Sequence, residues 1–490
     1  MKTTNFELTF QLEISSSLLQ NSFFSPLKFA EMQPNLDFHQ LKERRTNLLV
    51  RLNQDPENFV KTFYSQVSDK YFSPYLNLNN SDLCCLVGRR SLPTGQEAPI
   101  CYSAISQIAT GSHGTVYSVG SFDQNYALKV RKIGKLFIEY SPVLPNSERR
   151  VRRFSGECGF PLQFAQSSIG SDDFTNEILI SYLLEYLMEE TGALKAGLVN
   201  LVNTFDSTVC NIVNPGVFFR TRENLGVLLM EKGLSSFDQP FSTTFTPFQR
   251  EINWRGEFLP VFEQKFILDC FRQLVFILGF LEKTFNFSHG DLKVGNVVFF
   301  PERYFATYQG RQVASDFTLK IIDFEKSAIT VNLAGKDHRI YNRSFLADNY
   351  LRIRPFEPQI SKRLFTEPEG FQLSEQDSRE FYTLPGFTTS QIYAASRHRA
   401  TPFYQNFDIY TVFISFLLTP SFFIPVFSSS ELKKRIWDPL FLPEESSQIY
   451  QSLYSAQGNK NPNSTGEILD LLKGFQLKCN ILDLLLDSLF

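Results

Sequence analysis

The 490-residue sequence has no Cys-x-x-Cys pair, and its seven cysteines are scattered over positions 84, 85, 101, 158, 210, 270 and 479. An odd number of dispersed cysteines does not favour a disulfide framework, and the missing Cys-x-x-Cys spacing argues against a zinc site. The cysteines therefore indicate reduced thiols and an intracellular protein, which we expect to be cytoplasmic, with the nucleus left open.

The sequence also lacks a surplus of positive charge and a long uninterrupted apolar segment. Its 48 lysines and arginines face 51 acidic residues, which gives a formal net charge of −3. A nucleic-acid-binding protein would favour a basic surplus, so we expect no nucleic acid as main partner. The longest apolar run, residues 411–427, contains Pro420 and Pro425 and is shorter than the roughly 20 residues that cross a membrane. We expect no membrane span, and interpret the run as a buried core helix followed by a loop.

The N-terminal region has neither an apolar core nor a repeat. Glu7 places an acid early in the chain, which argues against a secretory signal. Helical patterns occupy residues 41–52 and 56–67, and the prolines and glycine of residues 91–99 predict a linker. The length of 490 residues exceeds one compact core and predicts two or three domains. Because residues 1–100 carry no recognisable motif, we interpret them as an N-terminal extension of unknown role.

A polar stretch at residues 287–296, Phe-Ser-His-Gly-Asp-Leu-Lys-Val-Gly-Asn, lies between two apolar segments. Before it, residues 266–283 repeat apolar side chains at helical spacing, and after it an apolar strand follows. Such a loop holds reactive groups rigidly at a buried edge. Its spacing, His-x-Asp-x-Lys-x-x-Asn, resembles the catalytic loop of protein kinases.

Two predicted strands upstream, near residues 108–117 and 126–130, are joined by a turn that contains Gly111 and Gly114. Glycines let backbone amides approach phosphate oxygens, although a plain β-hairpin explains them as well. Lys129 is a charged residue within an apolar strand, which indicates a specific role for its side chain. Together these residues resemble the kinase glycine-rich loop and its phosphate-binding lysine, with alanine in place of the family's first glycine.

Residues 172–187 predict an amphipathic helix with apolar positions 174, 178, 182 and 186. Within it, Glu177 matches the kinase glutamate that pairs with the strand lysine; a surface glutamate is the alternative. Residues 198–205 and 226–233 predict strands. The second resembles the kinase strand that leads to the hinge between the lobes, and a core strand that ends in a turn is the alternative.

Residues 317–325 predict a strand that ends in Asp323-Phe324-Glu325, where kinases have the metal-binding Asp-Phe-Gly. We expect residues 301–316 to form a loop and the chain beyond Glu325 to be irregular up to residue 407. The helix predicted from 407 to 418 resembles the central kinase helix, whose opening aspartate, here Asp408, anchors the catalytic loop. No Ala-Pro-Glu motif lies between, and Pro368-Glu369 is only a partial match.

This resemblance covers about residues 100–430 and implies an α+β, bilobal protein-kinase-like fold. A small β-rich N-lobe with one main helix would occupy residues 101–233, and a larger, mainly helical C-lobe residues 234–490. The implied function is ATP-dependent transfer of the γ-phosphate to a serine or threonine hydroxyl of a protein substrate, with Mg²⁺ or alternatively Mn²⁺ as the metal.

The resemblance also implies a role for each matching residue. Asp291 would accept the proton of the acceptor hydroxyl, Lys293 would neutralise the phosphoryl group, and Asn296 and Asp323 would bind the metal. Met230 would border the adenine, and the backbone near Glu231 would bond its edge. In full, the residues expected to bind the nucleotide are Gly111, Ser112, His113, Gly114, Val116, Ala127, Lys129, Glu177, Met230, Glu231 and Gly233.

Three functions stay open from the sequence alone. Lys293 favours a protein serine/threonine kinase, whereas Gly290 and Glu325 are familiar from small-molecule kinases that resemble aminoglycoside and choline phosphotransferases. A pseudokinase that acts as a binding module is the third. Glu325 would either add a metal contact or face solvent. Because Gly290 replaces the arginine that binds a phosphorylated activation segment, we expect alanine at the serines and threonines of 327–344 to leave turnover unchanged.

Overall fold

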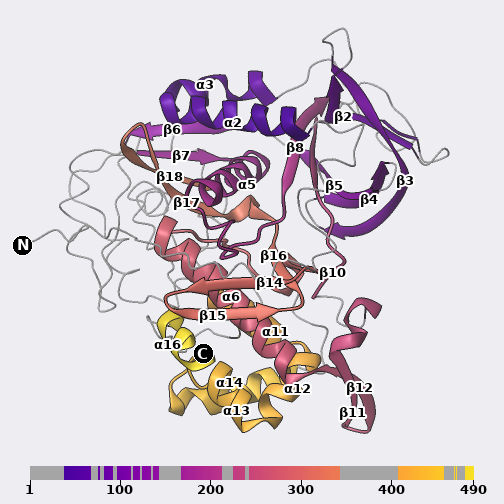
Figure 1. Ribbon diagram of the computed structural model, residues 1–490, viewed down its shortest axis with the longest axis vertical. Coiled ribbons are helices and arrows are strands. Elements are labelled where there is room, and N and C mark those ends of the chain that lie inside the picture. Colours follow the sequence, from indigo (N-terminus) through magenta and orange to yellow (C-terminus); the bar gives the residue numbers. More distant parts are fainter. Residues whose placement is uncertain are drawn as a thin grey trace, which may run out of the picture.

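The computed structural model describes residues 38–67, 75–77, 82–91, 97–111, 114–121, 124–133, 136–142, 167–211, 224–237, 242–342, 407–456, 468, 471 and 481–490. These residues form a mixed α+β structure that is compatible with the predicted bilobal arrangement. In Figure 1, strands from the first half of the chain dominate the upper part, and helices from the second half dominate the lower part.

The largest sheet is antiparallel and contains the predicted glycine turn. Its order is β1-β2-β3-β4-β5-β9-β8. The bounds of the strands are β1 Tyr75–Asn77, β2 Asp82–Ser91, β3 Glu97–Gly111, β4 Gly114–Ser121, β5 Gln124–Ile133, β8 Thr204–Asn211 and β9 Asn224–Glu231. The predictions of strands near 108–117, 126–130 and 226–233 are confirmed.

Two predictions in this region are wrong. Ser91 pairs with Glu97 in the β2–β3 ladder, so residues 91–99 join two strands of one sheet and are not a linker. The start of the N-lobe near residue 100 stays a prediction; that residue lies within β3. The strand expected over 198–205 begins only at Thr204, because residues 191–197 form turns; before β8, Leu201 makes an isolated bridge to Ile321.

A second sheet joins the segment after Glu325 to the main helix of the upper part. Its order is β17 (Ala328–Leu333), β18 (Lys336–Asn342), β7 (Ser167–Ser171) and β6 (Ile138–Pro142), with β18 and β7 parallel. The expectation of an irregular chain after Glu325 is therefore wrong for residues 328–342. Ala334 and Gly335 both have positive φ and form the turn of this hairpin, in which buried side chains alternate along β17 but are continuous over the second half of β18.

Helix α5 (Asp173–Glu190) follows β7 and is buried on most sides. Asp172 caps it by accepting hydrogen bonds from the backbone N–H groups of Phe174 and Thr175. The helix was correctly predicted, but more of its surface is buried than the single apolar face expected from the sequence. The reason is that α5 packs against β7, β8, β18 and a further helix, α2 (Phe38–Gln54). Every residue from Phe174 to Leu184 is buried.

The two N-terminal helices are confirmed and pack on this part of the fold. Leu49 and Leu52 of α2 and Phe59 and Phe63 of α3 (Pro56–Val67) belong to the same core cluster as α5. Arg45 of α2 donates to both carboxylate oxygens of Glu185 on α5, at 2.5 and 3.0 Å. Residues 38–67 therefore support α5 from outside.

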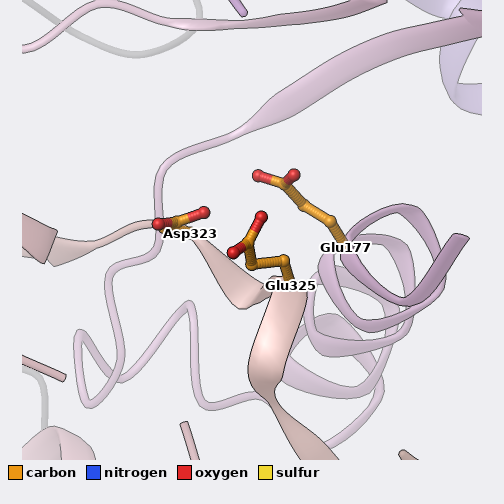
Figure 2. Close-up of side chains that lie close together, drawn as sticks. All are labelled: Glu177, Asp323 and Glu325. Carbon is orange, nitrogen blue, oxygen red and sulfur yellow. The ribbon is translucent and has the colours of Figure 1, made fainter. Parts of the chain in front are cut away.

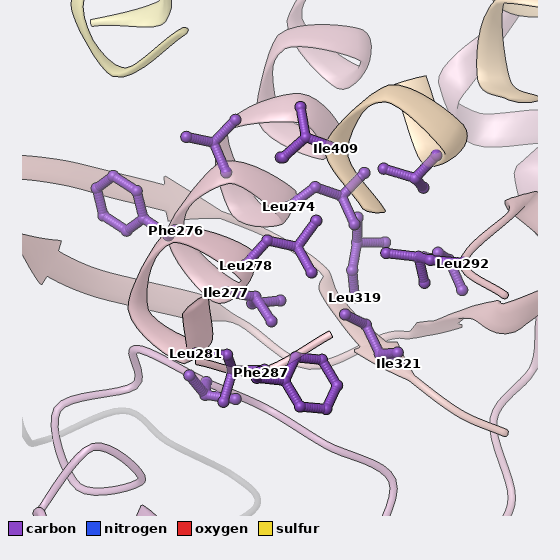
Figure 3. Packing of buried hydrophobic residues seen from close by; sticks show 14 of the residues in the cluster. Leu274, Phe276, Ile277, Leu278, Leu281, Phe287, Leu292, Leu319, Ile321 and Ile409 are labelled. Atoms are coloured by element: carbon purple, nitrogen blue, oxygen red, sulfur yellow. The ribbon is translucent and has the colours of Figure 1, made fainter. Parts of the chain in front are cut away.

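Helix α6 (Gln264–Phe285) forms the centre of the lower part, as its periodicity predicted. Figure 3 shows its Leu274, Ile277 and Leu278 packed among apolar side chains from other segments, including Ile409 of helix α11 (Phe407–Leu417) and Leu319 of strand β16 (Thr318–Ile321). The helix ends at Asn286, which has a left-handed φ of 46°.

The remaining described elements of the lower part are short helices and hairpins. The helices are α12 Pro420–Ser428, α13 Ser430–Leu432, the π-turn Lys433–Trp437, α14 Pro443–Ala456 and α16 Ile481–Leu489. The shorter elements are β10 Ser235–Ser236, the 3₁₀ turn Thr243–Phe248, β11 Gln249–Trp254, β12 Glu257–Phe262, β13 Val297–Phe300, β14 Tyr304–Tyr308 and β15 Arg311–Ser315.

Two further predictions are corrected here. Residues 301–316 are not a loop, because β14 and β15 pair as a hairpin that turns at Gln309 and Gly310, both with positive φ. The second half of the 411–427 run is helix α12 and not a loop. Among the described residues no single helix is long and apolar enough to span a membrane; α11 and α12 reach that length only together, and they are bent by 90°.

Candidate active site

The 287–296 loop connects α6 to β13 and is anchored through its backbone. At the start of α11, Asp408 accepts hydrogen bonds from the backbone N–H of His289 at 2.6 Å and of Gly290 at 2.9 Å. This confirms the predicted anchoring. Burial raises the pKa of Asp408 against the opposing effect of His289 and these amides. Gly290 has a φ of 80°, a left-handed conformation that glycine adopts without strain.

The same loop is tied to the segment that contains Asp323. His289 Nε2 lies 2.8 Å from the carbonyl oxygen of Ile322, and the hydroxyl of Ser327 donates to the carbonyl of His289 at 3.1 Å. The His289 ring also lies beside Phe324, with ring centroids 5.5 Å apart. These contacts fix the loop and the Asp323 segment relative to each other.

The three polar side chains of the loop lie together. Lys293 Nζ is 2.9 Å from an oxygen of Asp291, and the amide nitrogen of Asn296 donates to the backbone carbonyl of Asp291 at 2.8 Å. The amide oxygen of Asn296 is thereby directed elsewhere, as an acceptor. The side chains of Asp291 and Lys293 are 25% and 23% exposed, so a substrate can reach them.

A second group of charges is assembled from three distant segments. Lys129 Nζ on β5 donates to both oxygens of Glu177 on α5, at 2.7 and 2.9 Å, and to Asp323 at 2.7 Å. The structure thus joins Lys129 to Glu177, the pair that the kinase resemblance implied, and adds Asp323, which the resemblance implied only as a metal ligand. Glu177 is only 3% exposed, so its interpretation as a surface glutamate is wrong.

Burial and the neighbouring charges together shift the pKa values of these three residues. Burial would raise the pKa of Asp323, but the Lys129 ammonium, together with His289 and Lys293, outweighs burial and lowers this pKa to about 2. Burial raises the pKa of Glu177, with Lys129 opposing the change. For Lys129 itself, burial acts to lower the pKa, and Asp323 and Glu177 outweigh it and raise it. At neutral pH the ammonium and the Asp323 carboxylate are both charged.

Two further residues complete this group: Arg131, which the sequence reasoning did not consider, and Glu325, which was expected either to add a metal contact or to face solvent. Arg131, two positions after Lys129, donates to Glu325 at 2.6 Å, and both side chains are buried. We call Lys129, Arg131, Glu177, Asp323 and Glu325 the ionic cluster. Glu325 is 2% exposed, so the expectation that it faces solvent is wrong. For Arg131 the sequence did contain a signal: it lies two residues after Lys129 on β5, and residues two apart on a strand face the same side.

The oxygen atoms at this position fit a hard divalent cation. Carboxylate oxygens of Glu177, Asp323 and Glu325 lie within 4.8 Å of one another, and Figure 2 shows the three side chains converging from α5 and from the segment after β16. Glu177 and Glu325 are bonded to Lys129 and Arg131. Asp323, with one oxygen bonded to Lys129, and the amide oxygen of Asn296 are the ligands that suit Mg²⁺.

The predicted phosphate-binding hairpin has the expected geometry where it is described. Gly111 and Gly114 pair at the ends of β3 and β4, and a Cβ on Gly114 would lie 2.6 Å from the carbonyl oxygen of Val130. Only glycine fits there. Ser112 and His113, between the two strands, lie outside the described residues.

Three of the predicted nucleotide-binding residues, Val116, Ala127 and Met230, are close to one another in the sheet. Val116 pairs with Lys129, and Ala127 pairs with Met230 across β5 and β9. Because Ala127 and Lys129 are two residues apart on β5, these side chains lie on the same face of the sheet.

The segment 231–233 connects this sheet to the lower part. The backbone N–H of Glu231 donates to the carbonyl of Asn203, and its side chain accepts from Lys320 at 2.8 Å. A Cβ on Gly233 would lie 2.1 Å from a methyl group of Val298 on β13, so only glycine fits at position 233. The basic stretch at 148–153 and Pro368-Glu369 lie outside the described residues.

No protein-family model and no curated protein matches this chain. Among solved structures the chain is similar to that of vaccinia related kinase 3, with 11% sequence identity, 56% of each chain covered and a TM-score of 0.23. The chain thus covers little more than half of that structure. Because a TM-score this low does not define a shared fold, the function proposed below rests on the geometry of the site.

Proposed function

We propose that this chain is an ATP-dependent phosphotransferase with a protein-kinase-like fold, and that it phosphorylates serine or threonine hydroxyls of a protein. One observation supports this above the others: Lys129, whose side chain is only 12% exposed, is bonded to Glu177 of helix α5 and to Asp323, which lies 194 residues after Lys129 in the chain. A buried ion pair adds little stability over apolar residues of the same volume. A functional role explains why it is present.

Each part of the site would hold one part of the nucleotide. The backbone at Gly111 and Gly114 would lie over the phosphates, and Lys129 would bind them while held by Glu177. Met230, with the strand residues beside it, would border the base. The backbone N–H of Glu231 is already bonded to Asn203, so the base edge would use other backbone groups up to Gly233.

The loop side chains would act on the acceptor. A bound Mg²⁺, held by Asp323 and Asn296, would neutralise phosphate charge. Asp291 would orient the hydroxyl and take its proton as the new O–P bond forms and the bond from the γ-phosphorus to the leaving ADP oxygen breaks. Lys293, 2.9 Å from Asp291, would offset the charge on the transferred group.

A small-molecule kinase is the second candidate, because of two residues at the site. Gly290 and Glu325 match small-molecule phosphotransferases, and the buried position of Glu325 beside Asp323 makes this acid a neighbour of the metal-binding residues. Lys293, two residues after the proposed base, favours the protein kinase. The two candidates differ only in the acceptor.

Incubation with γ-labelled ATP and Mg²⁺ tests the proposal. We expect label on serine or threonine of added protein substrates or of the chain itself, and loss of labelling in Asp323→Asn. Asparagine is the suitable replacement because Asp323 has a left-handed φ of 72°, which asparagine tolerates. Label only on small metabolites would replace the first candidate by the second, and no label with retained nucleotide binding would indicate a pseudokinase.

A further inference from the structure

Strand β5 presents a second cation beside Lys129. Arg131 lies on the same face two residues later, and its guanidinium is 6% exposed. One of its nitrogens, Nη1, donates to Glu325 at 2.6 Å and also lies 3.8 Å from an oxygen of Glu177. Arg131 is therefore within reach of both acids, and at present it is bonded to Glu325.

Glu177 is thus shared between two competing cations. Lys129 is bonded to both of its oxygens, whereas Arg131 approaches the same carboxylate without a close contact. A guanidinium has a planar fork of donors that matches a carboxylate better than an ammonium does. Without another acid to bind it, Arg131 would compete with Lys129 for Glu177.

The backbone at Glu325 is held in place by two hydrogen bonds. Its backbone carbonyl accepts hydrogen bonds from the side-chain amides of Asn176 at 3.1 Å and Asn342 at 2.5 Å. The carboxylate is therefore presented to Arg131 from a fixed segment. Asp173 provides a weaker contact, with an oxygen 3.5 Å from the other nitrogen of the guanidinium.

We propose that Glu325 is a positioning residue that acts through Arg131: by binding the guanidinium it reserves both oxygens of Glu177 for Lys129. The inference rests on the proposed function only in assigning Lys129 to the phosphates of ATP. It gives the acid after Asp323-Phe324 a role without any contact to metal or substrate. It also explains why this acid is buried next to an arginine and does not point to solvent.

A four-protein cycle tests the proposal: wild type, Glu325→Gln, Arg131→Met and the double variant. In Glu325→Gln the released Arg131 binds Glu177, and kcat/KM for ATP should fall about tenfold, a usual coupling between charges in one network. In the double variant no guanidinium competes, so kcat/KM should return to within about threefold of wild type. A double variant as impaired as Glu325→Gln would overturn the proposal.

Folding does not obscure this result. Arg131→Met alone leaves Glu325 buried without its guanidinium and is expected to be the least stable of the four, whereas the double variant has no charge at either position. Thermal unfolding of each protein would accompany the kinetics. The comparison that decides the proposal is between Glu325→Gln and the double variant, and neither of them contains a buried carboxylate at position 325.

A crystal structure of Glu325→Gln separates this proposal from the proposed function. We expect a hydrogen bond between Arg131 and Glu177 and the loss of at least one bond between Lys129 and Glu177. That result would stand even if the wild-type protein transferred no phosphate. If the Lys129–Glu177 pair remained as it is in the wild type, Glu325 would not act by withholding Arg131, and the proposal would be wrong.

Discussion

The 287–296 loop and the ionic cluster form two parts of one candidate site, but the fold holds them by different means. The loop is one short segment whose backbone is bonded to Asp408 and to the hydroxyl of Ser415. The ionic cluster joins a strand, a helix and a later segment through side-chain charges, with Lys129 and Asp323 194 residues apart.

This difference affects which side-chain substitutions each part tolerates. A loop fixed by its backbone leaves the side chains of Asp291 and Lys293 partly exposed, so they can change without unfolding the protein. In the ionic cluster the side chains themselves determine the geometry. A single change there alters how every neighbouring charge is paired, so the cluster should couple activity to stability and the loop should not.

The largest effect is expected in the loop. Asp291→Asn removes the proposed proton acceptor, so kcat should fall by about 10²–10⁴. Because the side chain is a quarter exposed, the free energy of unfolding should change by no more than about 0.5 kcal/mol. Kinetics with labelled ATP and urea unfolding of the same preparation measure both. An active variant would show that Asp291 is not the base.

The anchor of the loop should contribute more to stability. Asp408→Ala leaves the buried N–H groups of His289 and Gly290 without their acceptors, and each such group costs about 1–3 kcal/mol. Urea unfolding should therefore show a loss of roughly 2–6 kcal/mol. Asp408→Asn keeps one acceptor oxygen and should lose less. Equal losses in the two variants would mean that the hydrogen bonds are not the cause.

A smaller, pH-dependent effect is expected beside the ionic cluster. Burial would raise the pKa of Asp173, but Lys326, together with Asn342 and Arg131, outweighs burial and lowers it. Asp173→Asn should cost about 1–3 kcal/mol at neutral pH, because charged hydrogen bonds are lost.

The sign of this pH dependence follows from the direction of the shift. A carboxyl whose pKa is lowered in the fold stabilises the fold above its ordinary pKa of 3.8 and loses this effect as the pH falls through the folded value. The difference in unfolding free energy between wild type and Asp173→Asn should therefore shrink below about pH 3.8. A difference that stays constant into acid would contradict the ion-pair explanation.

The smallest effect is expected in the hairpin that follows Glu325. Alanine at Thr330, whose hydroxyl accepts a bond from Arg339 at 3.1 Å, and at Ser344, outside the described residues, should leave turnover within about twofold. Ser327 is an exception among the serines and threonines of residues 327–344. Its buried hydroxyl donates to the carbonyl of His289, so Ser327→Ala should destabilise the loop by about 1 kcal/mol. A large loss of turnover in Thr330→Ala/Ser344→Ala would indicate regulation by phosphorylation.

Local patterns in the sequence predicted much of the fold. Apolar periodicity located helices α2, α3, α5, α6 and α11, because each repeats over three or more turns. The hairpins β14–β15 and β17–β18 were missed. Their strands are short and half polar, and only Gly310 and Gly335 indicated the turns. Residues 198–203 were expected to be a strand because an apolar run alone does not distinguish a strand from a buried loop.

The sequence by itself determined the 287–296 loop and its order of acid, cation and amide, because all of its groups lie within ten residues and their spacing is covalent. Tertiary structure alone decided that Arg131 and Glu325, 194 residues apart, share one buried ion pair. No local pattern reports such a contact, since it depends on how α5, β5 and the Asp323 segment pack. Whether Glu325 faces solvent or lies beside the metal-binding residues therefore depends on the tertiary structure.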